Sequence, residues 1–160
     1  MKSLNGIRLL ALDVDGVLTD GGLYYGPDGV VQRFSSSDGA GLVELRRRSF
    51  PVALISFRDF AATRRRAADL GIDILCLGSR EKAGALRRIC EQLSIDCERA
   101  LFMGDGVMDL PAIREAGVGA CPADAHPGVR DECDIVTESP GGKGAVREVV
   151  DMLLKELDNG

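Results

Sequence analysis

Short apolar runs alternate with amphipathic segments along most of this chain. A short, nearly continuous apolar run is typical of a strand that is covered on both faces of a parallel sheet. Such runs, expected to be strands, occupy residues 7–12, 52–55, 72–77, 100–103, 118–120 and 135–136. Amphipathic segments between them predict helices over residues 39–49, 60–70, 82–93, 108–116 and 143–157. This alternation predicts a doubly wound, Rossmann-like α/β fold with a mostly parallel sheet, in which ligands bind beyond the carboxyl ends of the strands.

One segment after the first predicted strand breaks the alternation. Residues 23–25 and 30–34 have the side chains of strands, and they flank Gly26-Pro27-Asp28-Gly29, a sequence typical of a tight turn. We therefore expect a short β-hairpin at this point in place of a crossover helix.

Length and composition limit the classes to which the chain can belong. A chain of 160 residues fits one domain, so we expect a single domain over residues 1–160. No apolar run is long enough for a bilayer span, and a net charge of −5 without any tryptophan argues against a nucleic-acid surface. Five cysteines without metal-ligand or Cys-x-x-Cys spacing fit a reducing compartment. We expect a cytoplasmic protein that binds neither membranes nor nucleic acids.

Two acidic residues, Asp13 and Asp15, follow the first predicted strand. Residues i and i+2 of a strand lie on the same side, so the two carboxyl groups are expected to point together. Like charges side by side need a cation between them or a shared proton. Mg²⁺ binds carboxylate and phosphate oxygens, so the pair fits a metal and phosphate site. Taken alone, such a pair is more often a loop cap or two solvated acids.

Further polar residues fall where predicted strands end or helices begin. Ser56 follows the second apolar run, Lys82 opens a predicted helix, and Asp105 and Asp109 follow residues 100–103. Each has an ordinary explanation by itself, as a helix cap, a solvated lysine or turn-forming aspartates. Together they supply a nucleophile, a metal site and groups for the phosphoryl oxygens, which is what phosphoryl transfer requires.

The segment Asp13-Val14-Asp15-Gly16-Val17-Leu18-Thr19-Asp20 resembles the signature of the haloacid dehalogenase superfamily of phosphotransferases. Ser56, Lys82 and Gly104-Asp105-Gly106-Val107-Met108-Asp109 follow in the order of that superfamily. The resemblance implies that Asp13 attacks phosphorus and forms an aspartyl-phosphate, and that Asp15 protonates the leaving alcohol and then activates water. It also implies that Ser56 and Lys82 bind the phosphoryl oxygens.

The resemblance further implies a Mg²⁺ cofactor. Asp13, the main-chain carbonyl of Asp15 and the carboxylate of Asp105 would hold the metal, and Asp109 would support these ligands from behind.

No cap domain is expected, although cap domains usually provide substrate selection in this superfamily. Only the hairpin separates Asp20 from Asp38, and one helix and one strand separate Ser56 from Lys82. An open site gives a small substrate few contacts and admits water, so another lid is needed. We expect an oligomer in which a neighbouring subunit supplies that lid.

This capless plan, with residues 37–39, 122–127 and 141–148, is similar to the 3-deoxy-D-manno-octulosonate 8-phosphate phosphatase family over nearly the whole chain. The resemblance implies a homotetramer, Mg²⁺ and a phosphorylated sugar acid as substrate, first of all 3-deoxy-D-manno-octulosonate 8-phosphate, in lipopolysaccharide biosynthesis. Two alternatives stay open. One is a phosphatase of acylneuraminate or other nonulosonate 9-phosphates, and the other is a non-catalytic assembly domain related to the partners of cytidylyltransferases.

Two positions depart from the pattern of that family. The chain has Ser56-Phe57-Arg58 where the octulosonate enzymes generally have Thr-Gly-Arg, and Gly106 where they often have a second aspartate. Arg58 keeps a guanidinium that can bind a substrate carboxylate or phosphate, which favours the octulosonate branch. The substrate is therefore less well determined than the chemistry.

Three other interpretations are disfavoured. Signalling receiver domains also use an aspartate, a hydroxyl and a lysine, but they place the nucleophile on a later strand than the acidic pair. The segment 141–144 lacks the hydroxyl residue of a phosphate-binding P-loop, although Lys143 and Arg147 are candidates for binding an anion. His126 has no partner at metal-ligand spacing.

Overall fold

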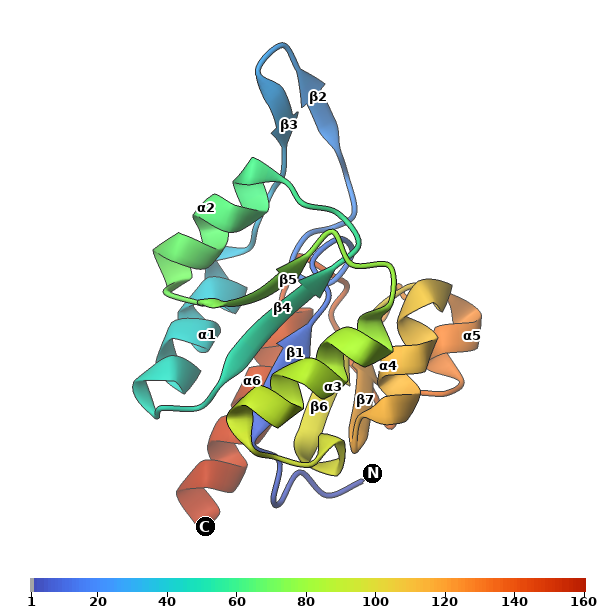
Figure 1. Cartoon of the computed structure of the whole chain (residues 1–160). Helices are drawn as coiled ribbons and strands as arrows, with labels where there is room; N and C mark the ends of the chain where they lie inside the picture. Colours follow the sequence, from blue (N-terminus) through green and yellow to red (C-terminus); the bar gives the residue numbers. More distant parts are fainter. Residues whose placement is uncertain (1) are drawn as a thin grey trace.

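The computed structural model describes residues 2–160 and contains one parallel sheet flanked by helices (Figure 1). Its strand order is β5-β4-β1-β6-β7-β8, and every neighbouring pair is parallel. The strands are β1 (Leu9–Leu12), β4 (Val52–Ser56), β5 (Ile74–Leu77), β6 (Ala100–Met103), β7 (Val118–Cys121) and β8 (Ile135–Val136). The predicted doubly wound α/β fold is confirmed.

Two hydrophobic clusters cover the two faces of this sheet. The helices are α1 (Ser36–Arg47), α2 (Ala61–Leu70), α3 (Lys82–Leu93), α4 (Leu110–Glu115), α5 (Pro127–Arg130) and α6 (Ala145–Asn159). Within β1, Leu10 and Leu12 pack with α1, α2 and α6, whereas Leu9 and Ala11 pack with α3, α4 and α5. Because all four residues of β1 are buried, this strand is apolar throughout, as a strand between two helix layers must be.

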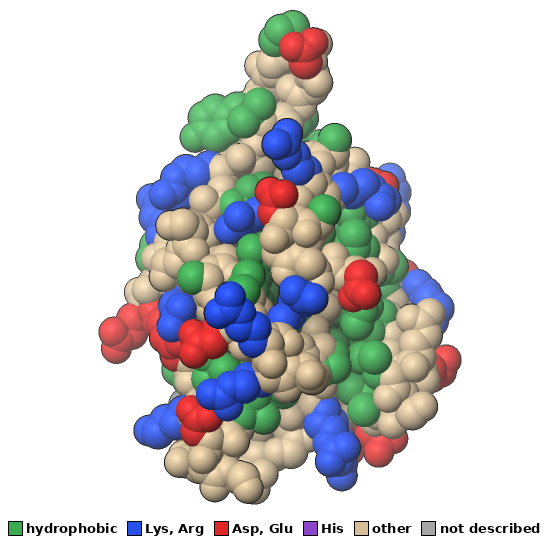
Figure 2. Space-filling view, turned by 90° about the vertical axis from the view of Figure 1, so that its left-hand side faces the viewer, with side chains coloured by type: hydrophobic (Ala, Val, Ile, Leu, Met, Phe, Trp, Pro, Cys, Tyr) green, Lys and Arg blue, Asp and Glu red, His purple; other side chains and the backbone are tan. Residues whose placement is uncertain are grey.

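The predicted hairpin is present between β1 and α1, with shorter strands than the sequence indicates. β2 (Tyr24–Gly26) pairs antiparallel with β3 (Gly29–Val31), and a single bridge between Thr19 and Phe34 closes the base. The hairpin projects from the body of the molecule and carries hydrophobic side chains into solvent (Figures 1 and 2). Tyr25 is 82% exposed.

Some element boundaries differ from the sequence prediction. Helix α1 begins before residue 39 because the Ser35 hydroxyl caps it by accepting the N–H of Asp38. The predicted helix over residues 108–116 is a 3₁₀ turn, η2 (Val107–Asp109), followed by α4. Helix α5 and a second 3₁₀ turn, η1 (Cys97–Arg99), were not predicted, since segments of three or four residues show no helical period.

The length of the helices and the distribution of surface charge bear on possible partners. Within residues 2–160, no helix combines the length and the apolar character that crossing a membrane requires. On the face shown in Figure 2, basic and acidic side chains are interspersed and form no single basic patch.

Candidate active site

The predicted site residues lie at one edge of the sheet, in the loops that follow adjacent strands. Leu12 at the end of β1 is in register with Met103 at the end of β6, so the loops that follow both strands begin side by side. The loop after β1 carries Asp13 and Asp15, and the loop after β6 carries Asp105. A pocket of about 360 Å³ opens at this edge. Its lining includes Asp13, Asp15, Phe57, Arg58, Lys82, Asp105 and Asp109.

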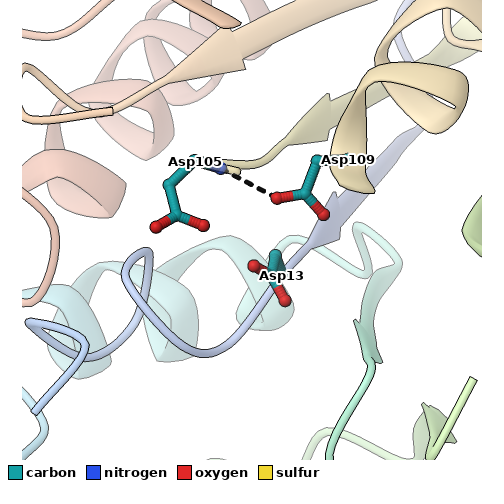
Figure 3. A group of neighbouring side chains, drawn as sticks. All are labelled: Asp13, Asp105 and Asp109. Carbon is teal, nitrogen blue, oxygen red and sulfur yellow. Dashed lines mark hydrogen bonds between the residues drawn. The ribbon is translucent and has the colours of Figure 1, made fainter. Parts of the chain in front are cut away.

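Three of these acids form a tight group (Figure 3). Asp13, Asp105 and Asp109 each offer a carboxylate oxygen, and these oxygens lie within 4.8 Å of one another. Asp13 is 5% exposed and Asp109 is 1% exposed. The Asp15 carboxylate lines the same pocket but does not belong to this group. Asp13 and Asp15 therefore line one pocket, but β1 ends at Leu12 and Asp15 lies in a turn, so the alternation of a strand is not what brings them together.

Lys82, the first residue of α3, is buried against this acidic group. Its Nζ lies 2.9 Å from Oδ1 of Asp13 and 2.5 Å from Oδ1 of Asp109. The carboxylate of Glu81 caps the same helix by accepting the N–H of Gly84, which holds the start of α3 at the pocket. One ammonium group therefore bridges two of the three acids.

Asp109 is held rigidly by its neighbours. Its Oδ2 accepts the backbone N–H groups of Asp105 and Gly106, at 2.9 and 3.0 Å, while its Oδ1 faces Lys82. Gly104 is required beside it, since any larger side chain there would overlap the Asp109 side chain. Both oxygens of Asp109 are thus engaged by the protein, and this geometry ties the loop that carries Asp105 to Lys82.

Burial makes these charges costly, as their pKa values show. Burial raises the pKa of Asp13 well above its ordinary value, and the charge of Asp109 adds to the effect while Lys82 opposes it. Burial and then Asp109 raise the pKa of Asp105 to about 6. Burial by itself would lower the pKa of Lys82, but the charges of Asp13 and Asp109 outweigh it, so that pKa is raised.

Asp15 has its own set of partners, which the sequence did not reveal. Gln32 Nε2 donates to Oδ1 of Asp15 at 2.8 Å, and the hydroxyl of Thr63 donates to Oε1 of Gln32 at 2.8 Å. Burial raises the pKa of Asp15, whereas the charges of Arg58 and Lys82 and the Gln32 hydrogen bond lower it. No sequence motif marked Gln32, since a single glutamine in a predicted strand has no chemical pattern around it.

The loop that follows β4 forms another part of the pocket wall. Ser56 is buried, does not line the pocket, and accepts the N–H of Arg58 with its hydroxyl at 3.3 Å. Phe57 and Arg58 do line the pocket. The guanidinium of Arg80 stacks over the ring of Phe57, 5.3 Å from its centroid. The residue that departs from the family pattern, Phe57, is therefore part of the pocket and has a cationic neighbour that was not predicted.

Two residues considered from the sequence lie outside this group. His126 Nδ1 accepts the N–H of Gly128 and caps α5. Arg147 pairs with Asp151 and with Glu44, so its guanidinium is already engaged on the side of α6.

The donor set fits a divalent cation. The group has three carboxylates and one ammonium group, which contacts two of them. This leaves an excess of negative charge that buried acids tolerate only with a further cation or with protonation. Gly16 has a φ of 81°, and a side chain at this position would occupy the place of the Asp105 carboxylate. The space beside Asp105 is thus kept clear by a glycine. Oxygen donors of this type are those that Mg²⁺ prefers.

Comparisons with known proteins agree with this arrangement. A family model described as haloacid dehalogenase-like hydrolase matches residues 37–117. The 3-deoxy-D-manno-octulosonate 8-phosphate phosphatase KdsC of Haemophilus influenzae is 40% identical over 155 residues, which cover 96% of this chain and 86% of that protein. KdsC of Escherichia coli K12 is 41% identical over 149 residues, covering 92% of this chain and 79% of that protein.

Solved structures show the same likeness. The 3-deoxy-D-manno-octulosonate 8-phosphate phosphatase of Moraxella catarrhalis, in complex with magnesium, phosphate and KDO, superimposes with a TM-score of 0.94 at 37% identity, covering 98% of this chain and 90% of that chain. The cobalt-bound Haemophilus influenzae enzyme gives a TM-score of 0.94 at 39% identity, covering 98% and 92%. The chain therefore belongs to the haloacid dehalogenase-like hydrolases and, among them, to the 3-deoxy-D-manno-octulosonate 8-phosphate phosphatase family.

Proposed function

We propose that this protein is a Mg²⁺-dependent phosphomonoesterase that works through an aspartyl-phosphate on Asp13. The observation that carries the proposal is the buried group of Asp13, Asp105 and Asp109 with Lys82 at the floor of an open pocket. An acidic group of this kind repels a phosphate ester by itself. It accepts one only when cations offset its charge, and Lys82 provides one of them.

The chemistry divides a slow hydrolysis into two transfers. In the first, a carboxylate oxygen of Asp13 bonds to phosphorus while the bond from phosphorus to the alcohol oxygen breaks, and Asp15 gives its proton to that oxygen. In the second, Asp15 takes a proton from water as the water oxygen bonds to phosphorus, and the bond to Asp13 breaks. Inorganic phosphate leaves and Asp13 is regenerated.

The remaining residues bind and orient the phosphoryl group. Lys82 offsets the charge of Asp13 and would face the phosphoryl oxygens. Ser56 directly precedes the pocket residues Phe57 and Arg58, and its hydroxyl keeps a proton that it could donate to the same oxygens while it accepts the N–H of Arg58. Asp13, the main-chain carbonyl of Asp15 and Asp105 would hold Mg²⁺, with Asp109 fixing the Asp105 loop. When bound, Mg²⁺ supplies charge neutralisation and orientation of the phosphoryl group.

We assign 3-deoxy-D-manno-octulosonate 8-phosphate as the substrate, with lipopolysaccharide biosynthesis as its setting. The names of the relatives and the KDO-bound neighbour support this assignment. Arg58 at the pocket wall offers a guanidinium for the substrate carboxylate. Phe57 in the same wall is the observation that keeps an acylneuraminate or nonulosonate 9-phosphate as the second candidate. A non-catalytic assembly domain is disfavoured because all of the site acids are present.

The open pocket supports a lid from another subunit, and the family resemblance implies a tetramer. We propose a cytoplasmic homotetramer of single-domain subunits, residues 1–160, in which a neighbouring subunit covers the site. The exposed side chains of the hairpin, Tyr24, Tyr25 and Val31, support it as a subunit contact. A monomeric mass in solution together with full activity would contradict this assembly.

The experiment is a phosphate-release assay with purified protein and Mg²⁺. Octulosonate 8-phosphate, nonulosonate 9-phosphates and hexose phosphates are compared by kcat/KM. We expect octulosonate 8-phosphate to lead by at least about tenfold, and Asp13→Asn to lower turnover by about 10³-fold or more on every substrate. Undiminished turnover by Asp13→Asn would remove the mechanism, whereas a lead for hexose phosphates would remove only the substrate assignment.

A further inference from the structure

We propose that Gln32 is a positioning residue for Asp15, held in place by Thr63, and that it connects the hairpin to the proton-transfer step. The inference rests on the proposed role of Asp15 as general acid and base. Its basis is the chain of two hydrogen bonds from Thr63 to Gln32 and from Gln32 to Asp15, each 2.8 Å long.

The first link orients the amide of Gln32. Gln32 is 9% exposed and Thr63 is 2% exposed, so both residues are largely shielded from water. The Thr63 hydroxyl donates to Oε1 of Gln32, which leaves Nε2 as the group that faces Asp15. An amide turned the other way would place its oxygen against the Asp15 carboxylate. The ionised Asp15 carboxylate only accepts, so it selects the orientation in which Gln32 is a donor, and Thr63 holds the amide there by donating to Oε1.

The second link makes the two oxygens of Asp15 unequal. Oδ1 accepts the N–H of Gln32, so this oxygen is engaged and the side chain is held in one orientation. The proton that Asp15 gives to the leaving group is then carried by Oδ2. A general acid is effective only within hydrogen-bonding reach of the oxygen that it protonates. Without Gln32, Asp15 would rotate and spend less time in the productive position.

The three residues come from three separate elements. Asp15 lies in the loop after β1, Gln32 directly follows β3 of the hairpin, and Thr63 lies in the first turn of α2. In Figure 1, α2 lies below the hairpin, where the returning strand enters the body. A displacement of the hairpin therefore moves Gln32 away from either Asp15 or Thr63. Contacts made by the hairpin are thereby transmitted to the acid.

The test compares substrates that differ in their need for an acid. An alkyl phosphate has a poor leaving group and requires protonation, whereas p-nitrophenyl phosphate has a good leaving group and requires little. Gln32→Met keeps the length of the side chain and removes the donor. We expect it to lower kcat/KM for the alkyl phosphate by about tenfold or more, and for p-nitrophenyl phosphate by less than about threefold. An equal fall on both substrates, or no fall on either, overturns the inference.

Thr63 provides an independent variant with a matched control. Thr63→Val keeps the shape of the side chain but removes the hydroxyl. We expect it to lower kcat/KM for the alkyl phosphate by about threefold and to leave kcat/KM for p-nitrophenyl phosphate nearly unchanged. Thr63→Ser restores the hydroxyl and is expected to match the unmodified protein. If Thr63→Val and Thr63→Ser behave alike, the link from Thr63 to Gln32 has no role and the proposal fails in that part.

Asp15→Asn separates a failure here from a failure of the proposed function. If Asp15→Asn lowers alkyl phosphate turnover selectively and Gln32→Met does not, only the positioning role is overturned. If Asp15→Asn shows no selectivity, the acid assignment itself is wrong, and the inference about Gln32 is overturned with it.

Discussion

Two buried carboxylates, Asp38 in α1 and Asp13 at the pocket, have opposite electrostatic surroundings. Asp38 is almost fully buried, and its Oδ1 accepts the backbone N–H of Arg147 in the first turn of α6 at 2.9 Å. The N-cap of α6 is Gly144, which has no side chain, so Asp38 caps this helix from another element. Burial raises the pKa of Asp38, and the N–H of Arg147 and nearby arginine charges oppose it.

Asp13 lies among charges of its own sign. Its neighbours include Asp105 and Asp109, and Lys82 is the cation that forms an ion pair with it among residues 2–160. The first turn of α6 and nearby arginine charges offset the charge of Asp38, although its buried Oδ2 has no hydrogen-bond partner among residues 2–160. Asp13 instead needs a further cation from outside the protein. The difference teaches that burial of an acid does not by itself mark a functional site. An excess of charge that the protein leaves uncompensated is the better criterion.

The largest effect on the charge balance of the pocket is expected from replacing Lys82. Lys82→Met leaves the acids of the pocket without their internal cation, and we expect it to destabilise the metal-free protein by about 3 kcal/mol. Urea unfolding in the presence of a chelator measures this change. Arg114→Met is the control, since its pair with Glu132 is exposed to solvent and a surface ion pair contributes little to stability. Equal effects of the two substitutions would show that the pocket charges are not coupled as described.

The pH dependence of the metal-free protein tests the excess charge directly. The pKa of Asp105 is raised from 3.8 to about 6 in the folded state, so folding favours its protonated form. Its contribution to stability is complete below pH 4 and is lost as the pH rises through about 6. We expect a loss on the order of 1–2 kcal/mol over this range.

The same measurement on Asp105→Asn serves as the control, because a neutral amide does not titrate. That variant should show a flatter profile between pH 4 and 6, and Mg²⁺ should raise its melting temperature less than that of the unmodified protein. A profile identical to that of the unmodified protein would assign the pH dependence to other groups.

Asp38→Ala tests whether Asp38 is a helix cap without a part in catalysis. Loss of a helix cap is expected to lower the free energy of unfolding by about 1 kcal/mol, with kcat/KM of the folded protein changed by less than about twofold. Asp38→Asn keeps an acceptor oxygen and should lose less stability. A large fall in kcat/KM without a change in stability would place Asp38 in the catalytic machinery, contrary to this interpretation.

The smallest expected effect concerns Phe57. Phe57→Gly opens the pocket wall and frees Arg80 from its stacking contact. We expect kcat/KM for octulosonate 8-phosphate relative to nonulosonate 9-phosphate to change by about threefold, roughly 0.7 kcal/mol, with stability nearly unchanged. A constant ratio of the two values would show that the ring does not take part in substrate selection.

The sequence by itself determined the order of the strands and helices and most of the site acids. The apolar runs indicated strands of a parallel sheet, Asp13 directly follows the first of them, and Asp105 follows the run 100–103 after one glycine. In a parallel sheet the carboxyl ends of strands share one edge, so local position along the chain was enough to bring these residues together. The start of α3 at Lys82 followed from helical periodicity in the same way.

Only the tertiary structure decided which partners each acid has. Asp15 accepts a hydrogen bond from Gln32, which is held by Thr63, and Asp13 contacts Lys82. The stacking of Arg80 on Phe57 likewise depends on where two loops meet. Such contacts join residues that are distant in the sequence and carry no local pattern. They are set by how loops and helices pack together, which periodicity along the chain does not encode.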